Sequence, residues 1–167
     1  LETPTWRASA DWGRLLGYDA PALAEANRDA VQLVRDLASE WRLRIEGPMV
    51  LSGVIGPRGD GYIATAPGSV GEADAYHRPQ AAALKAAGVD MLAAVTMTTA
   101  AEAAGVARAG ASVGLPVAIS FTIETDGRLP SGESVREAIE QVDADADAAP
   151  AYFVLNCAHP SHIDACL

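Results

Sequence analysis

The sequence predicts an α/β fold in which a parallel sheet is covered by helices. Short apolar segments alternate along the chain with longer segments whose apolar residues recur at helical spacing. Gly88 and Gly114 close two of the helical segments and lead directly into the next apolar segment. This alternation is typical of parallel strands that are joined by crossover helices.

Four apolar segments bounded by turn residues predict the strands. They are residues 49–55, 90–96, 116–122 and 151–156. Residues 1–5 are interpreted as the tail of a further strand that runs into a loop. Because the four segments are apolar almost throughout, we expect them to form a parallel sheet that is covered by helices.

Five segments are predicted to be helices. They are residues 22–42, 71–87, 99–113, 134–142 and a last helix that Pro160 opens. Ser134 and Glu137 have the spacing of a capping box, which marks the start of the fourth of these helices. Residues 6–18 are predicted to form a loop or a short irregular helix.

The longest loops follow strands, and they mark the expected functional face. These loops are residues 56–70 and 123–133. A closed eight-stranded barrel needs about 250 residues, whereas this chain of 167 residues holds four clear strand–helix units and a strand tail. The pattern alone therefore predicts one domain, residues 1–167, that is either an open doubly wound sheet or part of a barrel.

The composition narrows the possible partners. The net charge is −10 and the basic residues form no cluster, which argues against a nucleic-acid partner. No apolar run approaches the length of a membrane span, and no signal peptide is visible. With two cysteines in the chain, a secreted disulfide framework is not indicated. We therefore expect a cytoplasmic protein that binds neither nucleic acid nor membranes.

Six segments carry a resemblance to a known family. They are residues 3–9, 53–59, 76–80, 87–92, 120–132 and 156–157. In this order they resemble motifs of the homocysteine S-methyltransferase family, the zinc-dependent thiol-methylating barrels, from the second strand to the sixth. The resemblance implies a partial (β/α)₈ TIM barrel, an incomplete homocysteine-binding-type domain. It also implies that the four predicted strands are parallel, adjacent and in sequential order.

The resemblance also implies a site. Cys157 takes the place of the family's first zinc ligand, and Asn156, Thr122, Gly56 and Thr96 would line the barrel mouth and bind substrate. The other two zinc ligands of the family are an adjacent Cys-Cys pair, which this sequence lacks. We therefore expect Zn²⁺ in the complete protein and no tight zinc binding by this chain alone.

One further position departs from the family pattern. Val95 stands where the family usually places a glutamate that helps to hold the substrate amino group. A valine side chain cannot bind an ammonium group, so this position argues against homocysteine itself as the substrate.

The chemistry-bearing residues also have simpler interpretations. A cysteine that ends a strand is often a packed small hydrophobe, and Cys166 is expected to be one on a helix face. His77, at a predicted helix start, would make a structural hydrogen bond or lie at the edge of the site.

A local metal set is a further alternative. It would combine these four residues: Cys157, His159, His162 and Cys166.

Two other patterns are set aside. The loop 56–61 lacks the Gly-Lys-Ser/Thr ending of a phosphate loop. The alternating acids Asp143, Asp145 and Asp147 are expected to be a solvated connection, because no calcium-loop glycine or glutamate follows them.

Two functions remain open from the sequence. The first is methyl transfer to a zinc-bound thiol in the complete protein, with a small-molecule thiol and a methyl donor as partners. The alternative is a non-catalytic, barrel-derived module that binds a small molecule without metal. A partial barrel also leaves unpaired strand edges and partly uncovered inward residues, here Val54, Val95, Ile119 and Val154. We therefore expect either self-association through an open sheet edge or, as the favoured alternative, that the chain is part of a longer barrel.

Overall fold

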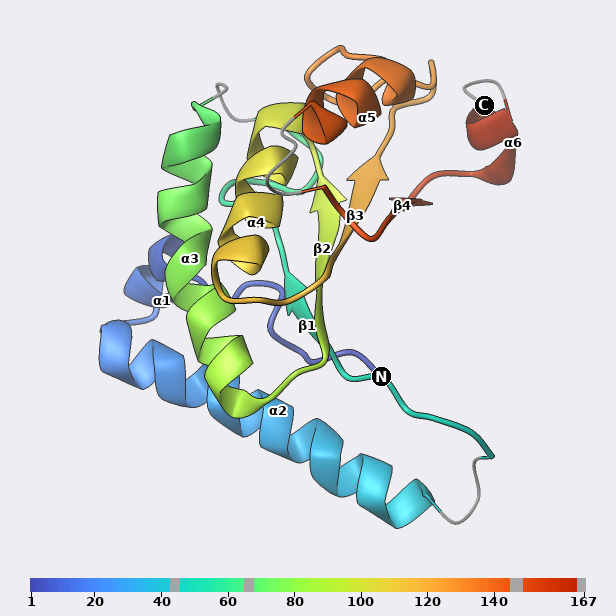
Figure 1. The fold of residues 1–167 in the computed structure, drawn as a ribbon. Helices are drawn as coiled ribbons and strands as arrows, with labels where there is room; N and C mark the ends of the chain where they lie inside the picture. The colour runs from blue at the N-terminus through green and yellow to red at the C-terminus, as the bar shows by residue number, and fades with distance from the viewer. Residues whose placement is uncertain (43–45, 65–67, 145–148, 165–167) are drawn as a thin grey trace.

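The fold is a four-stranded parallel sheet with α-helices packed on one of its faces (Figure 1). The computed structural model describes residues 1–42, 46–64, 68–144 and 149–164. The helices are α1 (Ala10–Leu15), α2 (Ala20–Trp41), α3 (Val70–Ala87), α4 (Ala100–Ser112), α5 (Val135–Asp143) and α6 (Pro160–Asp164). The strands are β1 (Ser52–Ile55), β2 (Met91–Met97), β3 (Val117–Thr122) and β4 (Tyr152–Asn156).

The strand order confirms the barrel arc. The sheet runs β1-β2-β3-β4, and each neighbouring pair is parallel. A doubly wound sheet would reverse this order at a switch point. Ahead of β1, Glu2 makes a parallel bridge with Ser52, and the Thr3 amide donates to the Ser52 carbonyl at 3.0 Å. The N-terminal segment therefore runs beside β1 as the predicted strand tail.

Helix ends follow local capping chemistry. Ser69 and Glu72 form a capping box at the start of α3, and Ser134 and Glu137 form the predicted one at the start of α5. At the end of α3, Gly88 has a φ of 87°, a conformation that glycine adopts without strain. These caps explain why the helix boundaries could be predicted to within a few residues.

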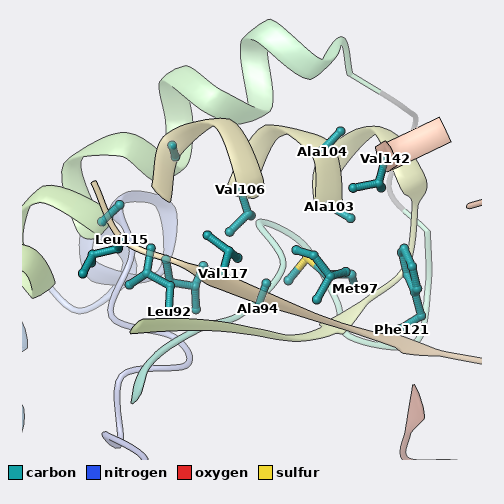
Figure 2. Packing of buried hydrophobic residues seen from close by; sticks show 14 of the residues in the cluster. Leu92, Ala94, Met97, Ala103, Ala104, Val106, Leu115, Val117, Phe121 and Val142 are labelled. Carbon is teal, nitrogen blue, oxygen red and sulfur yellow. The ribbon is translucent and has the colours of Figure 1, made fainter. Parts of the chain in front are cut away.

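The main core lies between the sheet and the helix pair α3 and α4. Figure 2 shows side chains from β2 and β3 meeting small and branched residues of α4. The labelled members of this core are Leu92, Ala94, Met97, Ala103, Ala104, Val106, Leu115, Val117, Phe121 and Val142. A Cβ on Gly105 would collide with Ala73, so the absence of a side chain lets α4 approach α3 closely.

Three expectations about the sheet are corrected. The first strand begins at Ser52 and not at residue 49, because the Leu51 amide is bonded to the Asp90 carboxylate at 2.8 Å. Ile119 is fully buried because it lies in register with Ala94 on the helix-covered face. Val54 is also buried, since Thr3 and Thr5 bond its backbone and the N-terminal segment covers it.

The remaining two inward residues agree better with an open arc. Val95 is half-buried and Val154 is 42% exposed.

Among the described residues, no helix is both long and apolar enough to cross a bilayer. Asp145, Asp147 and Cys166 lie outside the described residues.

Candidate functional site

The candidate site lies where the parallel strands end, at the upper edge of the sheet in Figure 1. Carboxyl ends of parallel strands share one edge, and loops from several strands can meet there. β2 ends at Met97, β3 at Thr122 and β4 at Asn156. Thr122 is buried and lies in register with Asn156, so two of the predicted site residues are direct neighbours.

A β-bulge near the end of β2 turns Thr96 toward this site. Ala94 pairs with Ile119 and Met97 with Phe121, so Val95 and Thr96 together stand opposite Ser120. Thr96 has a φ of 66°, which is rare and strained for a β-branched residue. Bulges re-aim side chains beside functional sites. Here the bulge brings the Thr96 hydroxyl within hydrogen-bonding distance of Asn156.

The Asn156 side chain is the centre of a hydrogen-bond network. Its Nδ2 donates to Thr96 Oγ1 at 2.8 Å and to Cys157 Sγ at 3.2 Å. Its Oδ1 accepts from Ser120 Oγ at 2.8 Å. A side-chain amide has two N–H donors, and both have partners here. Asn156 thus links β2, β3 and the residue after β4, a role for which the sequence offered no signal.

Cys157 stands immediately after β4 with its thiol exposed. Its φ is 54°, so two non-glycine residues with left-handed backbone, Thr96 and Cys157, flank Asn156 in this network. A hydrogen bond with the Cys157 side chain, followed by electrostatic repulsion from the same side chain, raises the pKa of the Tyr62 phenol above its ordinary value. Tyr62 comes from the loop after β1, and sequence reasoning did not single it out.

Gly56 is connected to the site through Trp6, which contacts both Gly56 and the end of β2. The Gly56 amide donates to the Trp6 carbonyl at 3.0 Å, and a Cβ on Gly56 would collide with that carbonyl oxygen. The Trp6 indole N–H in turn donates to the Val95 carbonyl at 2.9 Å. A Cβ on Gly61 would lie 3.1 Å from the Trp6 ring and 3.3 Å from Thr96 Cγ2. Gly56 is therefore needed for a close backbone approach, and the structure places it against Trp6.

His77 makes a buried structural contact. Its Nε2 lies 2.9 Å from Glu102 Oε1, and the same oxygen accepts the Arg58 amide at 2.6 Å. The His77 ring is fully buried and packs edge-on against Tyr76. This pair ties α3 and α4 to the loop after β1, which agrees with the structural interpretation of His77.

The described residues contain no cluster of three or more His, Cys, Asp or Glu side chains that could hold a metal ion. His159 Nδ1 is paired with Ser161 Oγ at 2.8 Å, and the His159 and His162 rings are 5.9 Å apart. Cys157 has the exposure and the donor atom of a metal ligand, but it is a single ligand. Among these residues, the donor set is insufficient for a tetrahedral zinc site.

Comparison with known proteins gives a family and a fold. The family model described as homocysteine S-methyltransferase matches residues 1–167. The oxidized form of the homocysteine methyltransferase MmuM from Escherichia coli superposes with a TM-score of 0.86 at 22% identity, covering 99% of this chain and 59% of that chain. Its metallated form gives 0.76 at 18% identity, with 98% and 77% covered. Its apo form gives 0.77 at 23%, with 99% and 58% covered.

The family model establishes the family of the chain. The solved structures are only 18–23% identical to the chain, so their similarity establishes the fold alone. The chain spans about three-fifths of the length of the first of them, 59%. None of the curated proteins matches the chain.

Proposed function

The chain belongs to the homocysteine S-methyltransferase family, and on that premise we propose that the complete protein transfers a methyl group to the sulfur of a small thiol. The reaction would take place at the mouth formed by the ends of β2, β3 and β4. The observation that carries the proposal is the placement of Cys157. Its exposed sulfur follows β4 directly and accepts a hydrogen bond from Asn156.

We propose Cys157 as one thiolate ligand of a zinc ion, with the remaining ligands supplied from outside the described residues. The metallated form of MmuM, a similar fold, supports a metal in this family. A zinc ion supplies Lewis acidity, which lowers the pKa of a bound thiol. In this chain, Asn156 orients the sulfur, as hydrogen-bonded neighbours do for metal ligands in general. Thr96 and Ser120 hold the Asn156 amide in place.

The lining of the mouth bears on the acceptor. Val95 is half-buried beside Thr96 and carries no charge. An acceptor ammonium group would find no counter-charge at this position. We therefore propose a thiol acceptor whose recognition does not depend on an ammonium contact at Val95. The methyl donor belongs to the class of electrophilic methyl compounds, such as methylsulfonium ions. A cytoplasmic location is part of the same proposal.

A methylation assay combined with metal analysis tests this function. The complete protein, and not the 167-residue chain alone, is incubated with zinc, a methylsulfonium donor and a panel of thiols that includes homocysteine, and methylated thiol is measured by mass spectrometry. We expect product and bound zinc for the parent and loss of both for Cys157→Ser. The chain's other cysteine provides the matched variant, Cys166→Ser, for which we expect both to be retained.

The same measurements separate the alternatives. Loss of zinc in both cysteine variants would favour the local set of Cys157, His159, His162 and Cys166. The non-catalytic binding module would be favoured if the protein bound a ligand without metal, formed no product, and bound the ligand equally well as Cys157→Ser. Two observations support this alternative: the described residues contain no cluster of metal ligands, and Val95 carries no charge.

A further inference from the structure

Arg7 lies between two tryptophan rings at the edge of the site. Its guanidinium carbon is 4.4 Å from the centroid of Trp6 and 3.7 Å from the centroid of Trp12. Stacking of this kind holds the planar guanidinium against the ring faces, so its N–H groups can donate only in the plane of the guanidinium. The arrangement presents a permanent positive charge with a restricted orientation.

Two hydrogen-bond donors in this stack lack acceptors. Arg7 Nη1 and Trp12 Nε1 are both buried atoms without a hydrogen-bond partner. Arg14 and Arg58, by contrast, both bond the Asp11 carboxylate, at 2.9 and 2.7 Å. Guanidinium and indole N–H groups can only donate, and burying them unpaired is unfavourable. The stack therefore lacks an acceptor, and because Arg7 is charged, an anionic acceptor suits it best.

The stack adjoins the mouth. Trp6 donates to the Val95 carbonyl at 2.9 Å, and its ring lies close to Gly61, which in turn lies close to Thr96. Thr96 is bonded to Asn156, the neighbour of Cys157. Arg7 as a residue is only partly buried, although its Nη1 and Trp12 Nε1 are buried atoms, so a ligand in the mouth meets the exposed part of the Arg7 side chain first.

We propose that Arg7 and Trp12 form a carboxylate-binding subsite beside the barrel mouth, through which one substrate of the proposed methyl transfer is held. This inference rests on the proposed function for the role of the ligand and on the stack alone for the binding. A carboxylate fits because its two oxygens lie in one plane and can meet the planar donor fork of arginine. Its single negative charge matches the single positive charge of Arg7.

Binding is tested without catalysis, by NMR titration of the ¹⁵N-labelled chain. The probes are propionate and its neutral, similarly shaped amide, propionamide. We expect propionate to shift the Trp12 indole N–H signal, and propionamide to bind at least about tenfold more weakly, because the charge-assisted bonds are lost. The Trp41 indole signal is the internal control, since Trp41 lies at the end of α2.

Three variants locate the contact. Arg7→Gln should weaken propionate binding by about tenfold or more, and Arg7→Lys, which keeps the charge without the fork, should fall between Arg7→Gln and the parent. Trp12→Phe keeps a ring beside Arg7 and removes the donor, so we expect weaker binding by several-fold, of the order of one hydrogen bond to a charged group. Arg14→Gln, a nearby exposed arginine, should change nothing.

The subsite is overturned if propionate and propionamide bind equally, if neither shifts the Trp12 signal, or if Arg7→Lys and Trp12→Phe bind propionate like the parent. These two conservative variants keep the test valid even where Arg7→Gln unfolds the chain. Failure of methyl transfer with Arg7-dependent propionate binding would refute the proposed function and leave the subsite standing. Methyl transfer without Arg7-dependent propionate binding would support the proposed function and refute the subsite.

Discussion

Asn156 Nδ2 donates a hydrogen bond of 2.8 Å to Thr96 Oγ1, and this bond joins the ends of two strands that are not neighbours in the sheet. β3 lies between them, and its Ser120 hydroxyl completes the link by donating to Asn156 Oδ1. Asn156 also donates a hydrogen bond to the sulfur of Cys157, the next residue in the chain, and so helps to hold it in place. The site is therefore built on strand ends that are cross-linked by one amide.

Asn156→Ala should lower the free energy of unfolding by about 1–3 kcal/mol, because the Thr96 and Ser120 hydroxyls lose their shared partner. Urea denaturation monitored by tryptophan fluorescence measures the change. Gln32→Ala removes an exposed side-chain hydrogen bond on α2 and is the matched control, with an expected change within about 0.5 kcal/mol. Equal changes for the two variants would contradict a structural role of the network.

Thr96→Val should destabilise the chain more than Thr96→Gly. The left-handed backbone of Thr96 is strained by roughly 1–2 kcal/mol, and glycine relieves this strain while losing one hydrogen bond. Valine keeps the branched shape and the strain and loses the same hydroxyl. Denaturant midpoints of the two variants give the comparison. A glycine variant as unstable as the valine variant would show that Thr96 is not strained.

Gly56→Ala should destabilise the fold by about 1–3 kcal/mol, since the added methyl group would collide with the Trp6 carbonyl oxygen, a backbone atom that cannot move alone. Gly71→Ala is the matched control. Gly71 lies in the first turn of α3, and its Cβ would meet no atom closer than 4.0 Å. The control should be neutral or stabilising by up to about 1 kcal/mol. Thermal melting of the two variants in parallel decides.

The stabilising effect of the Asp11 carboxylate should depend on pH. Its hydrogen bond to Arg58, with the charges of Arg58 and Arg14, lowers the pKa of Asp11 below its ordinary value. A carboxyl group whose pKa is lowered by folding stabilises the fold above its unfolded-state pKa, and this contribution is lost as pH falls through the folded-state pKa. Asp11→Asn should therefore lower stability at pH 7 by up to about 1 kcal/mol.

The difference between parent and Asp11→Asn should disappear in strongly acidic buffer, where both side chains are uncharged. Urea midpoints across the acidic range measure this convergence. Asp29→Asn, at an exposed position of α2, should match the parent at every pH. A gap for Asp11→Asn that persists at low pH would assign the effect to packing and not to charge.

The edge of β4 should mediate self-association of the 167-residue chain. β4 is the last strand of the sheet, and Tyr152 and Val154 on it are 51% and 42% exposed. Val154→Lys places a charge on this edge and should shift sedimentation toward monomer. Leu33→Lys, at an exposed apolar position of α2, is the control and should leave the distribution unchanged. A parent that is monomeric at all concentrations would refute this prediction.

The arrangement of elements could be predicted from the sequence because its causes are local. Apolar periodicity, the capping pair Ser134 and Glu137, and the left-handed Gly88 act within a few residues of one another. The placement of Cys157 after an apolar strand follows from the same patterns, since the end of a strand and the residue after it belong to one segment of the sequence. The family resemblance then resolved the choice between a doubly wound sheet and a barrel arc.

Only the tertiary structure decided how the site is assembled. The bulge at Val95 and Thr96, the engagement of both Asn156 donors and the stacking of Arg7 depend on contacts between segments that are distant in the sequence. In a regular strand, successive side chains point to opposite faces of the sheet, so the face of each residue can be predicted from the sequence. A bulge interrupts this alternation, and its position depends on pairing with a strand that is distant in the sequence. By itself the sequence determined the order of the strands and the position of the thiol. The packing of strand ends and loops against one another determined which polar groups surround that thiol, because hydrogen bonds form only where the folded chain brings donor and acceptor together.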